Sequence, residues 1–595
     1  MDVKAERHIN AVQNHLVPNS GDQPPLLRPY AAAPAGEQGY SVVLQEKLET
    51  GICHVRRSRR SPSRLISRFV DYPEISTLHD NFVRAADIFR DNKYLGTRVL
   101  HDGTIGESYK WMTYGEADKS RSAIGSGLIK HGITKGSCVG LFLVNKPEWV
   151  IVDHACSAYS LISVPLYDTL GPESVKYIVN HVSAQAIVCA SETLDTLLSF
   201  LSETPSVHLI VVVGRIDVQK ASSLNPSTNG VQIVSYSELY HEGLKSLQPF
   251  SPPTPDDIAT ICYTKRYNRH ISYLPLAHVY ERINQIMLVY CGGASGFYQG
   301  DNTKLLEDVA ALKPTIFCSV PRLYNRIYHG VMNSVKMCGF IKKMLFNAAY
   351  KAKKQAISND EKSSIIWDML VFNKLKEKLG GRVRCMISGA SPLSPDVMDF
   401  LRVCFGCKVV EGYGMTEASG AITCMDESDN LIGHVGSPIP SCEVKLVDVP
   451  EMKYTYDDQP YPRGEICTRG PIVFQGYYKD ETQTREVVDE DGWLHTGDIG
   501  LWLPGGQLKI IDRKKNIFKL AHGEYIAPEK IENVYAKCKF VAQCFIYGDS
   551  LNSALVAIVV VDHDVLKEYA ATQGIKGKIT VTPDIMPNYE KTLIV

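Results

Sequence analysis

The sequence has almost no net charge, since its 64 Lys and Arg are balanced by 65 Asp and Glu over 595 residues. Proteins that bind nucleic acid usually carry a basic excess, and no such global signal is present here. Nothing in the overall charge favours an acidic membrane surface either. We therefore predict no nucleic-acid partner and look for binding sites in local motifs.

Long apolar runs are also missing. The longest, residues 140–144 and 555–561, are far shorter than the roughly 20 residues that span a bilayer. Any membrane contact is therefore expected to be peripheral.

Paired cysteine motifs are scarce as well. Of the 16 Cys, only Cys404 and Cys407 stand at a spacing typical of metal ligands, and no second pair or group of His accompanies them. Buried thiols in a reducing compartment are the favoured interpretation, and a metal or redox site is the alternative.

What the sequence does contain is an alternation of β-rich runs and helical periods from Tyr40 onward. This rhythm predicts an α/β fold with parallel sheets. Between about Glu443 and Gly506 the strands become short and are separated by Gly, Pro and Asp turns, which indicates a small antiparallel barrel or sheet. A new α/β segment begins after Asp512, with a helix start at Pro528. The predicted parallel strands lie at 138–145, 186–190, 209–214, 315–320 and 383–388.

The segment from Glu411 to Glu417 has the residue types that an adenylate requires. Gly412 and Gly414 allow a tight turn, and Tyr413 between them offers a flat face for a purine. A hydroxyl for phosphate and a carboxylate for Mg²⁺ follow at Thr416 and Glu417. An ordinary turn is the alternative for the Gly-Tyr-Gly element alone. A small-residue loop at Ser388, Gly389 and Ala390 follows an apolar strand and could receive the adenine edge.

Two later segments add charged groups. Asp498, in Thr496-Gly497-Asp498, is suited to bind two ribose hydroxyls, although turn capping would also explain it. From Asp512 to Lys519, several cations accompany one acid, as in a phosphate clamp or a pivot between domains. A solvated basic run is the alternative there.

Taken in this order, the motifs resemble the long-chain acyl-CoA synthetases of the adenylate-forming superfamily, and the plant peroxisomal enzymes most of all. Segments 164–171, 273–282 and 320–324 sharpen the resemblance, which covers nearly all of the chain from Tyr40 to about Lys576. It implies a flexible tail at 1–39, a large AMP-binding domain at 40–511 and a partial C-terminal α+β domain at 512–595. The implied fold is a large multi-subdomain α/β adenylate-forming fold, with parallel sheets and a small β-barrel.

The resemblance also implies a reaction in two steps. A fatty-acid carboxylate attacks the α-phosphate of MgATP to give acyl-AMP, and the thiol of CoA then displaces AMP. Direct roles in catalysis are implied for Thr416, Glu417, Arg513 and Lys519, with Glu417 as the Mg²⁺ ligand. His278 matches the acyl-pocket histidine, and Asp512 matches the hinge between the half-reactions. The residues expected to bind the nucleotide are Ser388, Gly389, Ala390, Glu411, Gly412, Tyr413, Gly414, Asp498, Asp512 and Lys515.

The sequence departs from the family after Tyr263-Thr264. A Gly- and Ser/Thr-rich loop should follow there and cradle the β and γ phosphates, but residues 265–270 read Lys-Arg-Tyr-Asn-Arg-His. A segment this short cannot hold that loop and a crossover helix. The lysine that ends the family's C-terminal domain is also missing from residues 577–595.

Two functional hypotheses follow. The first is a long-chain fatty-acid CoA ligase that uses ATP and CoA. The second is a catalytically inactive truncated or spliced form that keeps the adenylate and acyl pockets and acts as a binding or regulatory protein, because the missing groups contact the transition state.

Location is predicted from the N-terminal tail. Residues 8–16 resemble an N-terminal peroxisomal address, except that His8 stands where Arg is expected. A peroxisome is therefore expected, with an import receptor as partner. The alternatives are the cytoplasm and a peripheral position on the endoplasmic reticulum.

Overall fold

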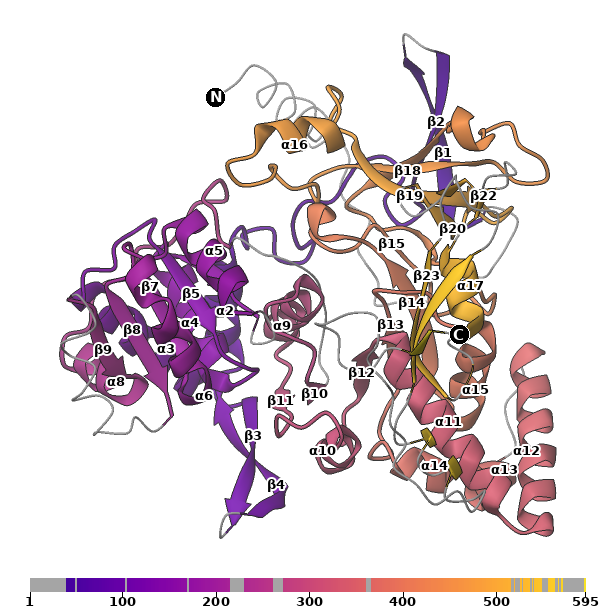
Figure 1. Ribbon diagram of the computed structural model, residues 1–595, viewed down its shortest axis with the longest axis horizontal. Coiled ribbons are helices and arrows are strands. Elements are labelled where there is room, and N and C mark those ends of the chain that lie inside the picture. The colour runs from indigo at the N-terminus through magenta and orange to yellow at the C-terminus, as the bar shows by residue number, and fades with distance from the viewer. Residues whose placement is uncertain are drawn as a thin grey trace.

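The computed structural model describes residues 39–48, 51–101, 104–167, 171–214, 230–260, 271–359 and 365–514, followed by short stretches at 518–519, 525–526, 528–535, 538, 540–547, 555–561, 565–566, 569–570 and 593–594. In one lobe, helices flank a parallel sheet. The second lobe combines another sheet, long helices and a six-stranded antiparallel sheet (Figure 1). None of the described helices is long and apolar enough to cross a membrane.

The first lobe is built on a parallel sheet of order β6-β5-β7-β8-β9. Its central strands are buried on both faces, because successive side chains point to opposite sides of a strand. In β7, Val188 packs into one hydrophobic core and its neighbour Ile187 packs into another. The strands are β5 (Cys138–Phe142), β6 (Ile162–Pro165), β7 (Ala186–Ala190), β8 (Leu209–Val213) and β9 (Gln232–Ser235). The accompanying helices are α2 (Leu78–Ile88), α3 (Tyr114–Lys130), α4 (Pro147–Ala158), α5 (Pro172–Val182), α6 (Ser191–Ser199), η1 (Leu201–Glu203) and α8 (Tyr236–Lys245).

The chain leaves this sheet at Thr260, which forms a parallel bridge with Ser163, and it enters a second sheet at Ile271. The sequence departure at 265–270 therefore falls between two sheets, within residues 261–270, which lie outside the described part. The second sheet has the order β10-β11-β3-β4. Its elements are β3 (Lys93–His101), β4 (Thr104–Thr113), β10 (Ile271–Ser272) and β11 (Ser295–Phe297), with helices α9 (Val279–Cys291) and α10 (Leu305–Leu312).

A third sheet, of order β12-β13-β14-β15-β16, carries the motifs singled out in the sequence. Its first three strands are parallel, so their carboxyl ends meet at one edge. The strands are β12 (Ile316–Ser319), β13 (Cys385–Ser388), β14 (Lys408–Tyr413), β15 (Thr423–Cys424) and β16 (Ser437–Pro438). The helices are α11 (Pro321–Met337), α12 (Phe340–Ser358), α13 (Ile365–Trp367), the π-helical η2 (Asp368–Phe372), α14 (Asn373–Glu377), α15 (Pro395–Phe405) and η3 (Thr416–Ala418).

The antiparallel region is a six-stranded sheet of order β1-β2-β17-β18-β19-β20. It curls so that its first strand meets the turn of its last hairpin, because Tyr40 N–H donates to Gly505 O at 2.7 Å and Ser41 Oγ donates to Gly506 O at 2.9 Å. The elements are β1 (Ser41–Leu48), β2 (Gly51–Ser58), β17 (Glu443–Val447), η4 (Pro450–Met452), β18 (Arg463–Arg469), α16 (Glu481–Val487), β19 (Leu494–Trp502) and β20 (Leu508–Arg513). The C-terminal elements are β21 (Phe518–Lys519), β22 (Tyr525–Ile526), α17 (Pro528–Tyr535), β23 (Val541–Tyr547), β24 (Val556–Val561) and β25 (Leu593–Ile594).

The predicted α/β class is confirmed. All five predicted parallel strands are present, and the region from Glu443 to Gly506 is antiparallel as expected. The sequence did not predict that hairpin β1–β2 would complete the antiparallel sheet. The expected boundaries at 39 and 512 stay predictions, and segment 8–16 lies outside the described residues. Cys404 and Cys407 are buried, and burial raises the pKa of both thiols, that of Cys407 to about 12, which favours the interpretation as inert thiols.

A buried ion cluster attaches the N-terminal hairpin to the rest of the sheet. Glu443 of β17 is completely buried, and its carboxylate pairs with Arg57 of β2 and, at 2.7 Å, with Arg469 of β18. Three neighbouring strands therefore depend on one carboxylate. Removing it would leave two buried guanidinium groups without their counter-charge.

We expect Glu443→Ala to lower the free energy of unfolding by about 3–5 kcal/mol, because breaking a buried pair strands its partners. Thermal and urea unfolding would measure the loss. Glu481→Ala, which removes an exposed carboxylate paired with Arg485, is the matched control and should change stability by less than about 0.5 kcal/mol. Equal stability of the two variants would show that the cluster does not hold the hairpin.

Candidate active site

The small-residue loop at Ser388, Gly389 and Ala390 lies where β13 ends, at the edge shared by the parallel strands. Ala390 has a φ of 73°, a backbone conformation that side chains other than Gly rarely adopt. Ser388 is completely buried, and its Oγ has no hydrogen-bond partner among the described residues. A strained loop with an unsatisfied buried hydroxyl is typical of a ligand site.

The segment from Glu411 to Glu417 begins on the neighbouring strand β14 and continues into η3. Gly414 is required here, because a Cβ at this position would lie 1.6 Å from the carbonyl oxygen of Gly420. The Oγ1 atom of Thr416 is buried, and no described residue bonds to it. Glu417 is held from both ends, since Tyr477 Oη donates to its Oε1 at 2.8 Å and Phe474 N–H donates to its carbonyl at 2.8 Å.

Glu411 is buried behind this turn, where it holds the two loops together. Its Oε1 accepts the Leu393 N–H at 2.9 Å, which joins the end of β14 to the loop that follows β13. Burial raises the pKa of this carboxyl to about 7. Because Glu411 is only 4% exposed, it stabilises the two loops and is not itself accessible to a ligand.

Asp498 joins three segments that are far apart in the sequence. Its Oδ2 accepts the Tyr413 hydroxyl at 2.6 Å, and its Oδ1 lies 2.9 Å from Nε of Arg513 on β20. Asp498 is buried, whereas the Arg513 side chain is 47% exposed. Burial and the nearby Asp498 charge raise the pKa of Tyr413 well above its ordinary value, so its hydroxyl keeps the proton that it donates. The structure thus brings together residues that the sequence assigned separately to adenine and ribose.

A bulge in the sheet presents Asp498. Glu465 of β18 pairs with Ile499 of β19, and Cys467 pairs with His495, so β18 advances two residues while β19 advances four. The motif residues Thr496, Gly497 and Asp498 of β19 thus lie opposite the single residue Ile466 of β18, and Gly497 takes a φ of 73°. Bulges often redirect a side chain beside a site. Here the bulge turns the motif toward β14.

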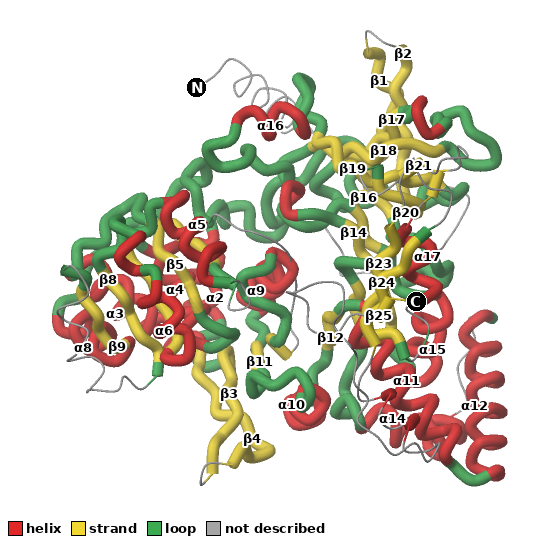
Figure 2. Tube along the Cα trace, in the orientation of Figure 1, coloured by secondary structure: helices red, strands yellow, loops and turns green. Residues whose placement is uncertain are grey.

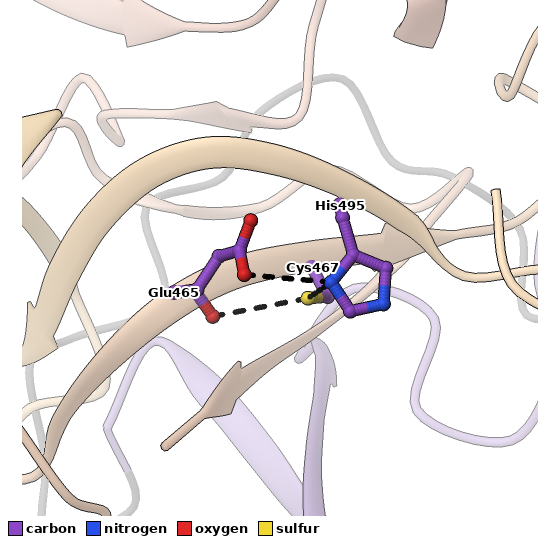
Figure 3. A group of neighbouring side chains, drawn as sticks. All are labelled: Glu465, Cys467 and His495. Carbon is purple, nitrogen blue, oxygen red and sulfur yellow. Dashed lines mark hydrogen bonds and ion pairs between the residues drawn. The ribbon is translucent and has the colours of Figure 1, made fainter. Parts of the chain in front are cut away.

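Glu465, Cys467 and His495 form a cluster beneath this bulge, in which their side chains point toward one another (Figure 3). The Gly497 N–H donates to Glu465 Oε1 at 3.1 Å. Glu465 Oε2 lies 3.5 Å from His495 Nδ1 and 3.7 Å from Nζ of Lys514. Glu465 therefore contacts both the Thr496-Gly497-Asp498 motif and the segment that follows Asp512.

Charge decides between an ion-pair cluster and a metal site. Asp489, Cys467 and Glu465 together raise the pKa of His495 to about 12, so the imidazole is protonated at neutral pH. A protonated imidazole offers no lone pair to a metal, and burial raises the pKa of the Cys467 thiol, which disfavours the thiolate. We therefore interpret the cluster as an imidazolium held between the carboxylates of Glu465 and Asp489.

His278 caps the N-terminus of α9, where its Nδ1 accepts the Tyr280 N–H at 3.4 Å. The Tyr280 hydroxyl donates to Ser319 O at 2.5 Å, and its ring lies 3.4 Å from where a Cβ on Gly389 would be. The first turn of α9 therefore borders the loop at Ser388, Gly389 and Ala390.

The proposed hinge residue Asp512 is buried and accepts the Arg513 N–H at 3.1 Å. Lys515 lies outside the described residues, and Lys519 is described only as part of strand β21. Contacts therefore join Tyr413, Asp498 and Arg513 among the predicted site residues, and the roles expected for the others stay predictions.

Sequence reasoning missed Glu465, His495 and Tyr477. Glu465 and His495 stand next to motifs that were recognised, but only the register of β18 against β19 shows that they meet. Tyr477 is 60 residues from Glu417, and no local pattern marks it.

The sequence pattern of the AMP-binding enzyme family matches residues 90–264 and 265–478. The two matched segments meet at Thr264 and Lys265, where the expected phosphate loop should begin. The A-PCP didomain of carboxylic acid reductase from Segniliparus rugosus, solved with AMP, has a similar fold, with a TM-score of 0.69 and 25% identity over 84% of this chain and 73% of that one. The fold and the site define an AMP-binding enzyme.

Relatives narrow the class. The chain is 64% identical to the peroxisomal long chain acyl-CoA synthetase 6 of Arabidopsis thaliana, over 96% of this chain and 85% of the relative. It is 62% identical to synthetase 7 of the same plant, over 96% and 86%. The chain belongs to the long-chain acyl-CoA synthetase family. The alignment with synthetase 6 spans 601 positions, which is more than the 595 residues of this chain, although only 96% of the chain is aligned. Within the aligned region, the relative therefore has residues that this chain lacks.

The raised pKa of Glu411 predicts a pH dependence of stability. A carboxyl whose pKa is higher in the folded state favours folding fully below its ordinary value of 4.5, and that contribution is lost as the pH rises through about 7. We expect Glu411→Gln to reduce the loss of unfolding free energy between pH 5 and pH 8 by about 2–3 kcal/mol, at about 1.4 kcal/mol per pKa unit. Urea unfolding at four pH values would measure it, with the exposed Glu427→Gln as control. Parallel pH profiles for Glu411→Gln and the unsubstituted chain would contradict the prediction.

The bond from Gly497 to Glu465 predicts that Glu465 positions the Thr496-Gly497-Asp498 motif, which we expect to bind ribose. Glu465→Ala should weaken binding of a non-hydrolysable acyl-adenylate analogue about tenfold, because one lost hydrogen bond to a charged group is worth about 1.5 kcal/mol. Glu465→Gln keeps an acceptor for Gly497 and should recover most of the affinity.

Glu451→Ala is the matched control for that prediction, since Glu451 also pairs with Lys514, at 3.4 Å, without a recorded bond to the motif. Calorimetric titration would compare the three variants. Equal losses in Glu465→Gln and Glu465→Ala would assign the effect to charge and not to the Gly497 bond.

Proposed function

We propose that the site of this chain activates a long-chain fatty acid as its acyl-adenylate and transfers the acyl group to CoA. The observation that carries the proposal is the junction of Asp498 with Tyr413 and Arg513, beside the unsatisfied buried hydroxyls of Ser388 and Thr416. This arrangement offers a carboxylate for ribose, an aromatic face for adenine and hydroxyls for phosphate.

In the first step, a carboxylate oxygen of the fatty acid attacks the α-phosphorus and pyrophosphate leaves. Glu411 and Gly414 fix the turn that carries Thr416, and we assign the Thr416 hydroxyl as a donor to an α-phosphate oxygen. In the second step, the sulfur of CoA attacks the acyl carbon and AMP leaves. We assign Arg513 to the nucleotide in both steps, because it remains half exposed while it pairs with Asp498.

The residues present also fit a Mg²⁺ ion. Glu417 offers a carboxylate held in place by Tyr477, and the hydroxyl of Thr416 next to it has no partner among the described residues. Bound there with ATP, Mg²⁺ would neutralise phosphate charge. We propose Glu417 as its protein ligand.

The two half-reactions make different demands on the chain. Adenylation requires a grip on the β and γ phosphates, which residues 265–270 would have to supply in place of the Gly-rich loop. Transfer to CoA starts from acyl-AMP, which has no β or γ phosphate. It needs a bound acyl-adenylate but no grip on the β and γ phosphates, and the predicted adenylate residues Tyr413, Asp498 and Arg513 lie in contact with one another. No comparison supports the inactive form as a separate class, since the matched relatives are named as synthetases and ligases.

The test supplies the two half-reactions separately to the purified chain. We expect acyl-CoA to form from palmitoyl-adenylate and CoA, and Asp498→Ala to lower kcat/KM by about 10²-fold, because removal of a buried charged partner costs about 2–5 kcal/mol. Asp458→Ala is the matched control, since Asp458 pairs with Arg463 through Nε at 2.8 Å in the same sheet. Mass spectrometry would follow the product.

Starting from ATP and palmitate, pyrophosphate release would establish the complete ligase. Transfer without pyrophosphate release would assign the loss to the phosphate loop and favour the alternative form. If neither half-reaction occurs and palmitoyl-adenylate does not bind, the proposed function is wrong.

We also propose that the enzyme acts in the peroxisome. Support comes from the two Arabidopsis relatives, both named peroxisomal, and from segment 8–16. A fusion of residues 1–39 to a fluorescent protein would test this address, with a His15→Ala variant of the fusion as control.

A further inference from the structure

Exposed apolar side chains gather at one corner of the molecule. Among the described residues, eight of the 22 large hydrophobic side chains that are exposed fall between Met337 and Leu370. Four of them lie where α11 ends and α12 begins, and we call these four the apolar tip. They are Met337 (89% exposed), Phe340 (81%), Ile341 (75%) and Met344 (58%).

Three of the four tip residues lie on the outer face of α12, and Met337 is the last residue of α11, so the tip does not belong to the core. Phe340, Ile341 and Met344 have the spacing of one helical face. The inner face is set by Phe346, Ala349 and Lys353, all of which are buried. In Figures 1 and 2, α12 stands at the edge of the molecule, next to α11 and beyond the sheet that holds the nucleotide site.

The helical segment formed by α13 and η2, which contacts α12, also exposes apolar side chains. Ile365, Ile366, Met369 and Leu370 are all more than half exposed. This helix is fixed to α12 by Lys353, whose Nζ lies 2.6 Å from Asp368 and 4.4 Å from the centre of the Phe372 ring. Both apolar groups therefore belong to one rigid helical corner.

The same corner is strongly basic although the whole chain is neutral. Between residues 336 and 378, the described part contains nine Lys and only two acids, Asp368 and Glu377. Lys336, Lys342 and Lys343 are exposed directly beside the apolar tip. Apolar residues flanked by lysines are typical of helices that lie in the interface of an anionic membrane.

We propose that the apolar tip and its lysines dock this protein on the surface of an anionic lipid bilayer. Phe340, Ile341 and Met344 would enter the acyl boundary while Lys342 and Lys343 pair with lipid phosphates. The tip lies at the turn between two helices, so its side chains project outward, which suits insertion into lipid. The charge balance selects an anionic surface over a neutral one.

The docking is argued from the tip alone, whereas the benefit of docking for catalysis rests on the proposed function. A long-chain fatty acid partitions into bilayers, so an enzyme held at their surface works where its substrate is concentrated. Docking and catalysis involve different residues and can fail separately.

The experiment measures how much of the full chain sediments with lipid vesicles. One set of vesicles contains phosphatidylcholine alone, and the other also contains about 30% phosphatidylserine, which gives it the negative surface of an anionic leaflet. We expect binding to the anionic vesicles that weakens as salt is raised. The double variant Phe340→Glu with Ile341→Glu should bind at least tenfold more weakly. Lys342→Glu with Lys343→Glu should lose the preference for anionic lipid.

The matched control is Ile88→Glu with Leu247→Glu, which changes two side chains of 56% and 58% exposure outside this corner and should bind as the unsubstituted chain does. All variants should melt at the same temperature. Glu417→Gln should bind vesicles normally, which separates docking from the proposed catalysis.

Equal binding by the tip variant and the control would overturn the proposal. So would a tip variant that changes the oligomeric state in light scattering while vesicle binding stays unchanged, because the tip would then face a second copy of the chain. Binding that does not depend on phosphatidylserine would exclude the assigned role of the lysines.

Discussion

The site depends on one buried carboxylate, Asp498, which is shared between a tyrosine on β14 and an arginine on β20. Each partner comes from a different sheet, so the pair of contacts joins the parallel and antiparallel parts of the chain at the proposed nucleotide site. A buried carboxylate is costly unless it is well paired, and this cost makes the geometry specific. The exposed half of Arg513 leaves part of this arrangement accessible to a ligand.

The surrounding backbone is built to hold that carboxylate in place. The bulge in β19 redirects the motif, Glu465 accepts the Gly497 N–H, and the protonated His495 balances the charge of Glu465 and Asp489. On the other side, Glu411 joins the loops after β13 and β14. The buried hydroxyls of Ser388 and Thr416 have no partner among the described residues, and we expect the nucleotide to lie on their side of the two loops.

How far the sequence predicts this structure depends on the range of the contacts. The parallel strands and the start of α17 follow from local apolar runs and a proline, and they were predicted within a few residues. Asp498 and Tyr413 were assigned to one ligand by resemblance, and the structure places their side chains in contact, while the assignment to a ligand stays a prediction. The hydrogen bond between them, the attachment of β2 through Glu443 and the Glu465–His495 pair could not be predicted, because strand register and buried charge partners are tertiary properties. The exposure of the α12 tip is likewise hidden, since an apolar helical face usually points inward.

Charge distribution separates the two working surfaces of the molecule. At the nucleotide site, acids and bases alternate within a few ångströms, so their fields cancel beyond the pocket and act only on a bound ligand. Among the described residues around α12 the lysines exceed the acids, and most of these lysines lie on the exposed surface, where their field extends outward by about a Debye length, about 8 Å at physiological salt. A chain with no net charge can therefore attract an anionic surface from one corner while the carboxylates of its nucleotide site stay locally paired. Neutral composition excludes only a global electrostatic preference, and the local arrangement decides what the protein meets.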